Sequence, residues 1–193
     1  MARNSSTDVE REILNSAASL IARFGPERST IQQVADATGY SKAGLLHHYS
    51  SKRELQDAVF ELSRAKIHAV YTSVETVPVG AVRDRMVITA LLDLSLELPG
   101  VVSLMLAPLT AGDDEIAERL DGVVLSASFN GVQENKPYAR RLKADVARQV
   151  DISAALGAVS VGSLLLPIAD AADDLKSQLI DACMRILDHG TPA

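Results

Sequence analysis

The stretch from Ser29 to Leu55, STIQQVADATGYSKAGLLHHYSSKREL, constrains the fold of this chain more than any other. Thr30 is placed to cap a helix, and Gln33 follows at the three-residue spacing of a capping box. The apolar side chains of the next turns fall on one helical face: Ile31, Val34 and Ala35. Gly39 can adopt the positive φ that ends a helix. The pattern predicts a short amphipathic helix closed by a glycine.

A second short helix and a longer one follow this glycine. Ser41 can cap a helix that runs to about His48, and Ser51 with Glu54 forms a second capping box that opens the longer helix. Two helices around a three- to four-residue turn containing glycine form the helix-turn-helix pattern. In that pattern the second helix enters the major groove of DNA.

The segment GYSKAGLLHHYSSKREL resembles the recognition-helix signature of the TetR (tetracycline-repressor) family, with Thr30 to Gly39 as the preceding helix. The resemblance covers roughly the first 60 residues, and beyond them it is one of architecture. Two positions depart from the family pattern: Gly44 stands where the family often has Thr, and Leu46 where it usually has Tyr. Such positions commonly touch bases or phosphates, so the departures bear on half-site preference and on backbone contacts.

The resemblance implies a set of DNA-binding residues: Thr30, Ser41, Lys42, Ala43, Gly44, His47, His48 and Lys52. Lys42 can donate to guanine or contact a phosphate. Lys52 opposes the dipole of its helix, which suits a bound phosphate, although an ordinary surface lysine would need no explanation. His47 and His48 could also be plain solvated side chains. Leu45 and Tyr49 are predicted core residues, and Tyr40 fits either the core or a phosphate contact.

The charge distribution separates the chain into two parts. The net charge is −6, but residues 1–64 hold eight basic and eight acidic side chains, whereas residues 65–193 hold eleven basic and seventeen acidic ones. The first part is therefore neutral rather than basic. We expect its non-specific DNA affinity to be modest and strongly dependent on salt.

Several classes of protein are disfavoured by what the sequence contains. Cys183 is the only cysteine, so an intrachain disulfide or a cysteine metal cluster is excluded, and its apolar neighbours predict a core position. The most apolar stretch, 152–169, is broken by Ser, Gly and Pro, which argues against a membrane span. The N-terminal residues lack an apolar signal core, so we expect a cytoplasmic protein. No catalytic triad, P-loop or metal-ligand spacing is present, and we expect no enzyme activity, cofactor or metal.

The rest of the chain predicts helices. Amphipathic or apolar segments are expected at 9–24, 51–74, 82–98, 101–109, from 113, 138–150, 152–168 and 172–187, separated by Gly and Pro breaks, with 129–150 the least defined. The predicted fold class is all-α: a three-helix helix-turn-helix DNA-binding head at 1–52 and a helical ligand-binding and dimerisation domain at 53–193. Apolar side chains of the middle helices fit either a ligand pocket or plain core, so no pocket residue is assigned.

Small residues between Ala154 and Ser163 allow two interpretations. They permit close packing within one chain, or a two-fold bundle in which the last two helices pair with their copies. The family resemblance favours homodimerisation through these helices, and a bipartite operator needs two heads about 34–36 Å apart.

These patterns predict a ligand-responsive transcriptional regulator, more specifically a repressor. A homodimer would bind an inverted-repeat operator in double-stranded DNA and be released by a small, mainly apolar effector. The alternative, supported by the neutral head and by the departures at Gly44 and Leu46, is a helical sensor or protein-interaction module that has lost DNA binding.

Overall fold

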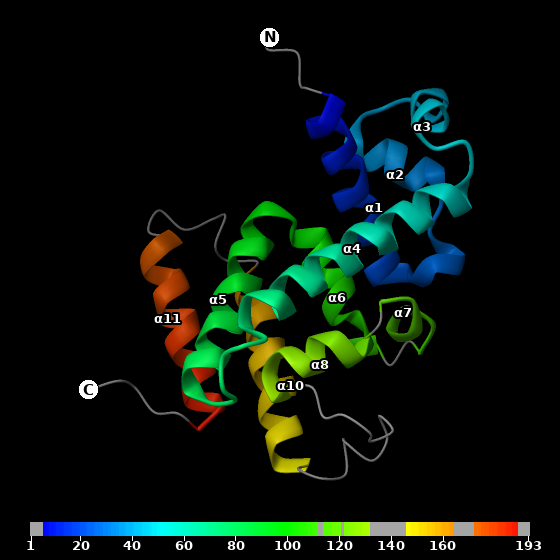
Figure 1. Cartoon of the computed structure of the whole chain (residues 1–193). Helices are drawn as coiled ribbons and strands as arrows, with labels where there is room; N and C mark the ends of the chain where they lie inside the picture. The colour runs from blue at the N-terminus through cyan, green and yellow to red at the C-terminus, as the bar shows by residue number, and fades with distance from the viewer. Residues whose placement is uncertain (1–5, 112–113, 121, 132–145, 164–171, 189–193) are drawn as a thin grey trace. The chain divides into compact units, whose positions relative to one another are not determined.

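The computed structural model describes residues 6–111, 114–120, 122–131, 146–163 and 172–188, and within these ranges the chain is all-helical. Figure 1 shows the ten helices found there, which confirm the predicted fold class. They are α1 (Ser6–Arg28), α2 (Ile31–Thr38), α3 (Lys42–His48), α4 (Lys52–Val74), α5 (Ala81–Glu97), α6 (Pro99–Ala111), α7 (Asp114–Arg119), α8 (Gly122–Asn130), α10 (Val146–Gly162) and α11 (Ala172–Ile186).

The helices divide into two compact units. Unit 1 comprises Met1–Ala65 and Leu98–Leu120, and unit 2 comprises Lys66–Glu97 and Asp121–Ala193. These units are defined by packing, whereas the predicted domains 1–52 and 53–193 are defined by function. The functional division at residue 52 therefore stays a prediction.

Helix α1 contributes to the core of unit 1 and is interrupted at the predicted Gly25-Pro26 break, although it continues for a further turn instead of stopping there. Its buried side chains recur at three- and four-residue steps: Ile13, Leu14, Ala17, Ala18 and Ile21. The regular helix stops at Gly25, which has φ 78° and ψ 162°, and a last turn runs from Pro26 to Arg28. The Gly25-Pro26 break is thus a kink near the end of α1.

Helix α6 packs along α1 with very little space between the two backbones. A Cβ atom at Gly100 would lie 2.0 Å from the carbonyl oxygen of Asn15 and 3.0 Å from the backbone nitrogen of Ser19. The Gly100 N–H donates to the side-chain oxygen of Asn15 at 2.8 Å. Glycine is therefore required for this helix crossing, because any side chain would push the two helices apart.

Helix α2 ends at a glycine with left-handed backbone geometry. Gly39 has φ 73° and ψ 8°, and a Cβ atom at this position would meet nothing within 4 Å. The predicted positive φ is confirmed. Since the surroundings are open, only backbone strain opposes another residue here.

Two details of the helix ends differ from expectation. The sequence predicts that Pro108 and Gly112 close the apolar piece at 101–109; α6 continues through Pro108 to Ala111, and Gly112 lies outside the described residues. At the start of α4, the Glu54 N–H donates to the Ser51 hydroxyl as predicted, at 3.1 Å. The Glu54 carboxylate, however, accepts from the N–H and hydroxyl of Ser50 instead of the N–H of Ser51. The cap is therefore spread over two serines.

Unit 2 is organised around a buried arginine. The Arg83 side chain is 2% exposed, and its guanidinium donates to four backbone carbonyl oxygens at 2.6–2.9 Å. They belong to residues at or near the ends of α4 and α8: Val74, Val77, Ala127 and Ser128. A cation at the negative ends of two helices is favourable. Arg83 therefore ties these ends to the first turn of α5.

A buried ion pair lies one residue further along α5. Arg148 of α10 donates to both carboxylate oxygens of Asp84, at 2.8 and 2.6 Å, and Asp84 is fully buried. A charge-assisted pair in which one guanidinium nitrogen donates to both carboxylate oxygens restricts the relative orientation of its two helices. It sets how α10 packs on α5 within unit 2.

Helices α10 and α11 pack closely against each other. A Cβ atom at Gly162 would lie 2.4 Å from a methyl carbon of Leu179, so a glycine lets α11 approach. Cys183 of α11 is buried, as predicted, and burial raises the pKa of its thiol to about 11. The predicted segment 138–150 falls mostly outside the described residues, and α10 begins at Val146, earlier than the expected residue 152.

Every helix within the described ranges is too short or too polar to pass through a lipid bilayer.

The crossing of α1 and α6 gives a first prediction. Gly100→Ala is expected to destabilise the protein by about 2–3 kcal/mol, because the added methyl group meets backbone atoms that cannot move independently. Gly157→Ala in α10, measured on the monomeric protein, is the control, since a Cβ atom there meets nothing of its own chain within 4 Å. Thermal unfolding followed by circular dichroism measures both. Equal melting temperatures for the two variants would contradict the close approach at Gly100.

The turn after α2 gives a second prediction. Gly39→Val is expected to destabilise the protein by about 1 kcal/mol or more, since a β-branched residue is strained at positive φ. Gly39→Asn is the control, because asparagine tolerates this conformation far better. If the Gly39→Val and Gly39→Asn variants had the same melting temperature, the left-handed geometry of the turn would be refuted.

Candidate DNA-binding interface

The start of α2 is held by a complete capping box. The Thr30 hydroxyl accepts from the Gln33 N–H at 3.2 Å, and the Gln33 side-chain oxygen accepts from the Thr30 N–H at 2.8 Å. The Thr30 hydroxyl also donates to that oxygen at 3.1 Å. The predicted box is confirmed, and Thr30 has a structural role whether or not it touches DNA.

Helix α3 is capped by Ser41. Its hydroxyl accepts from the Gly44 N–H at 3.0 Å, and a Cβ atom at Gly44 would lie 3.2 Å from that same oxygen. The hydroxyl hydrogen of Ser41 is not used by this bond and is available for a phosphate oxygen. Glycine at position 44 leaves room for the cap.

The two sides of α3 have opposite characters. Leu45 is 1% exposed and Tyr49, directly after the helix, is 6% exposed, so both belong to the core as predicted. The Tyr49 hydroxyl donates to the Glu10 carboxylate of α1 at 3.3 Å. Burial, followed by the nearby Glu10 charge, raises the pKa of Tyr49 well above its ordinary value, so it stays neutral.

The outward side of α3 carries the residues that the sequence singles out. Lys42, Ala43, His47 and His48 are all exposed, and Gly44 is half-buried. The imidazole rings of His47 and His48 meet edge to face, with centroids 6.1 Å apart. Among the residues that the structure describes, no group of three His, Cys, Asp or Glu side chains is placed to hold a metal ion.

Lys52, in the first turn of α4, already has a partner in unit 1. Its ammonium donates to the carbonyl oxygen of Glu27 at 2.6 Å, in the last turn of α1. One turn later, the Gln56 amide donates to the Pro26 carbonyl oxygen at 2.6 Å. An ammonium group has three donors, so Lys52 can hold α1 and still bind a phosphate. Sequence reasoning found Lys52 but not this anchoring role.

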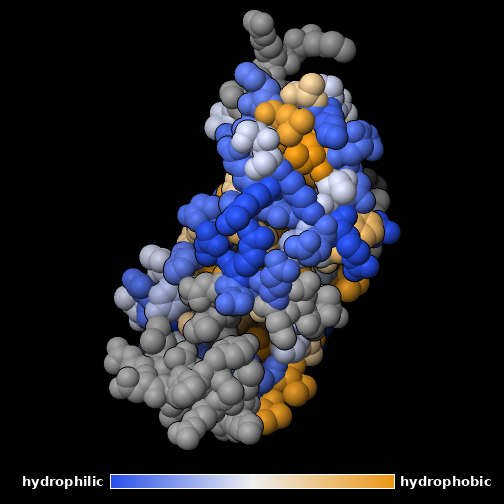
Figure 2. Space-filling view, turned by 90° about the vertical axis from the view of Figure 1, so that its right-hand side faces the viewer, coloured by the Kyte–Doolittle hydropathy of each residue, from blue (hydrophilic) through white to orange (hydrophobic). Residues whose placement is uncertain are grey.

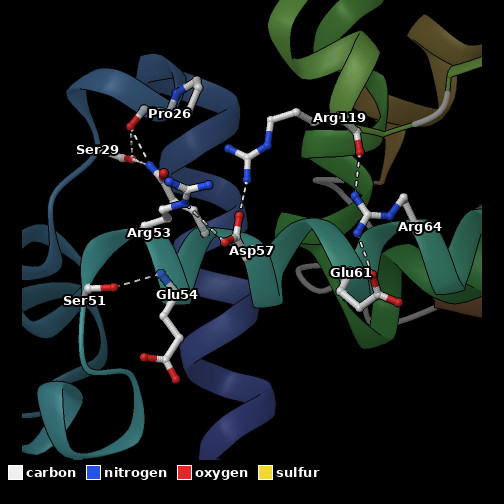
Figure 3. A network of polar contacts seen from close by, with 10 residues as sticks. Pro26, Ser29, Ser51, Arg53, Glu54, Asp57, Glu61, Arg64 and Arg119 are labelled. Atoms are coloured by element: carbon white, nitrogen blue, oxygen red, sulfur yellow. Dashed lines mark hydrogen bonds and ion pairs between the residues drawn. The ribbon is translucent and has the colours of Figure 1, made fainter.

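Figure 3 shows the polar contacts that hold the N-terminal half of α4 beyond Gln56. Arg119, the last residue of α7, donates to the Asp57 carboxylate at 2.8 Å, and its guanidinium lies 3.8 Å from the ring centroid of Phe60. Arg64 donates to the Arg119 carbonyl oxygen at 2.8 Å and to Glu61. Since Phe60 is fully buried, the stacking of Arg119 contributes more than the exposed ion pair. No local sequence pattern indicates this contact.

The acidic groups near α3 are engaged in these structural roles. Hydrogen bonds from the Ser50 side chain and backbone lower the pKa of Glu54, so it stays charged. Asp57 is paired with Arg119 and, at 3.8 Å, with Arg53. The exposed side of α3 itself carries a lysine and two histidines but no acid. The surface offered by α3 therefore suits a polyanion better than the neutral charge of residues 1–64 suggests.

Comparison with known proteins supports this geometry. Residues 13–59 match the family model of bacterial regulatory proteins, tetR family. Among curated proteins, no sequence shows significant similarity. The crystal structure of the TetR-like transcriptional regulator LfrR from Mycobacterium smegmatis is similar over 96% of this chain and 97% of that one, with a TM-score of 0.61 and 20% identity.

Two further crystal structures resemble the chain more distantly. A tetR-family transcriptional regulator from Streptomyces coelicolor has a TM-score of 0.44 and 18% identity, over 94% of this chain and 81% of that one. FadR from Bacillus subtilis, in complex with stearoyl-CoA, has a TM-score of 0.48 and 13% identity, over 93% and 98%. LfrR shows that the fold extends beyond the matched segment, and the family is one of DNA-binding regulators rather than enzymes. The helix-turn-helix segment of the chain thus matches the tetR family of bacterial regulatory proteins, and the fold of LfrR is similar over nearly its whole length.

Proposed function

We propose that this regulator is a repressor that binds an inverted-repeat operator as a homodimer and is released by a small, mainly apolar effector. DNA recognition is supported mainly by the contrast between the two sides of α3. One side is buried through Leu45, while the other presents exposed Lys42, Ala43 and His47. A helix held this way can enter the major groove without rearrangement of its own core.

The proposed contacts divide by chemistry. Lys42 and Ala43 lie at the start of α3, the part of a recognition helix that meets base edges. Ser41 and Thr30 supply hydroxyl groups at helix starts, and Gly44 lets the backbone come close to the DNA. His47 and His48 at the end of α3 can donate to bases or phosphates. Lys52 is proposed to bind a phosphate, which positions the head without reading sequence.

Dimerisation is supported by an uncovered apolar face on α10. Val146, Val150 and Val161 are 60–68% exposed, and they share one helical face with exposed Ala154 and with Gly157. A Cβ atom at Gly157 would meet nothing within 4 Å, so this face is open. A stripe of large exposed valines is unfavourable in water and suits an interface. We propose that a second copy of the chain covers it.

The other side of the same helix is already used within the chain. Ala155 and Val159 are buried, and Gly162 contacts Leu179 of α11. The small residues of this segment therefore serve both of the packing modes that the sequence left open. Buried positions join α10 to α11, and the exposed positions are left for a partner.

We infer the effector from the family resemblance. A ligand weakens operator binding only if it binds the DNA-bound and free states with different affinities. A coupling free energy of about 3 kcal/mol would reduce operator affinity on the order of a hundredfold. An apolar effector would suit the aliphatic side chains of the middle helices, and the pocket residues are not assigned.

DNA binding is tested by fluorescence anisotropy with an operator obtained by selection from random DNA, at several salt concentrations. We expect tight binding of two protomers per inverted repeat, with affinity falling steeply as salt rises. Lys52→Ala should weaken binding to all sequences alike and lower the log–log salt slope by about two for the dimer, one phosphate per protomer.

Two variants serve as controls for Lys52. Lys52→Arg keeps the positive charge and should keep most of the slope. Lys66→Ala removes a lysine of the same helix that pairs with Glu97, and should leave the slope unchanged. A full slope in Lys52→Ala would exclude phosphate contact at this position, and the absence of any selected DNA would refute operator binding.

Dimerisation is tested by placing a charge on the exposed face of α10. Val161→Glu is expected to shift the protein from dimer to monomer in sedimentation velocity, since the carboxylate would be buried unpaired in the interface. Val82→Glu, at an equally exposed valine of α5, is the control and should remain dimeric. A dimer that tolerates charges at both Val161 and Val150 would place the interface elsewhere.

A further inference from the structure

The recognition helix exposes a large apolar side chain that the proposed contacts do not use. Leu46 is 37% exposed, and in the described part of unit 1 it is the single large hydrophobic side chain with this degree of exposure. Figure 2 shows apolar side chains among hydrophilic ones near the upper end of the face it presents.

A single exposed leucine does not by itself indicate a binding site, but the position of Leu46 on α3 is informative. It follows Ala43 by three residues and precedes His47 by one, so the three share the outward side of α3. Leu45, the neighbouring leucine, holds the helix in the core at 1% exposure, so Leu46 is not needed there. Leu46 therefore lies on the exposed side of α3, the side proposed above to enter the major groove.

The chemistry of this side limits what it can recognise. Leucine and alanine carry no hydrogen-bond donor or acceptor in their side chains, so they cannot read the polar edges of bases. The apolar group that the bases present in the major groove is the C5-methyl group of thymine. Covering this methyl group removes apolar surface from water on both partners. Gly44 has no side chain that could compete with Leu46 for contact with the thymine methyl group.

We propose that Leu46, together with Ala43, reads thymine methyl groups, so that each half-site of the operator contains a T·A pair at a position set by Leu46. The inference deepens the proposed DNA binding and rests on it. It names the sequence class of the operator and assigns a specificity-determining residue that donates no hydrogen bond.

The test removes the methyl group without changing any hydrogen bond. In the selected operator, each thymine is replaced in turn by uracil, and affinity for the full-length protein is measured by anisotropy at fixed salt. At the position read by Leu46, the change should weaken binding by about fourfold in one half-site, as expected for one methyl group left in water. Replacing thymine by uracil at this position in both half-sites should reduce the affinity on the order of tenfold.

The variant Leu46→Ala, combined with the uracil substitution, completes a double-mutant cycle between the side chain and the methyl group. This variant should bind the thymine operator more weakly than the original protein and should lose most of the discrimination between thymine and uracil at that position. Leu96→Ala is the matched control, because Leu96 is similarly exposed at 45% but lies on α5. It should keep the full discrimination. Thermal unfolding confirms that all variants fold.

The outcomes separate this inference from the function on which it rests. Tight, salt-dependent binding with no effect of uracil at any position overturns thymine reading and leaves the operator-binding function intact. Unchanged discrimination in Leu46→Ala overturns the assignment to Leu46. Restored affinity when 5-methylcytosine replaces cytosine at the same position of a T-to-C operator supports recognition of the methyl group itself. Failure to select any DNA overturns both.

Discussion

The DNA-binding head depends on the capping of two helices that are too short to stand alone. Helices α2 and α3 have eight and seven residues, well below the length at which an isolated helix is stable in water. Thr30 and Ser41 satisfy backbone N–H groups at their starts, and Leu45 and Tyr49 anchor α3 in the core. Each cap is worth about 1 kcal/mol, a large share of what holds a helix of two turns. The exposed side of α3 is held in place because the start of the helix is capped and its other side is buried.

The parts of this head that could be predicted are those determined by neighbours in sequence. A capping box spans three residues, and a helix-ending glycine acts on its own backbone, so Thr30, Gln33, Gly39 and Ser41 were all readable. The departures came where the chain had a choice of equivalent partners. The Glu54 carboxylate could accept from either of two adjacent serines, and it accepts from Ser50. The presence of the helix can be predicted whichever serine is used, whereas the hydrogen bonds of its cap cannot.

What could not be predicted are contacts between residues far apart in the chain. Lys52 and Gln56 bind the carbonyl groups at the end of α1, and Arg119 stacks on Phe60, yet each side chain reads locally as a solvated polar residue. Arg83 shows the same limit in unit 2. An arginine in the first turn of a helix opposes its dipole, so local reasoning assigns it to the surface. It is buried because it neutralises the ends of two other helices, and no pattern near residue 83 records them.

The neutral charge of residues 1–64 has a consequence for how such a regulator finds its operator. Electrostatic attraction to any DNA is weak when basic and acidic side chains balance, so discrimination has to come from contacts inside the groove and from joining two heads. An apolar reader such as Leu46 suits this arrangement, because its contribution does not decline with salt as phosphate contacts do. In the proposed dimer, joining two heads would make the second contact intramolecular, which raises affinity without new contacts in either half-site. Under the two proposals, the exposed valines of α10 and the exposed leucine of α3 would both contribute to selective binding by a protein with little general affinity for DNA.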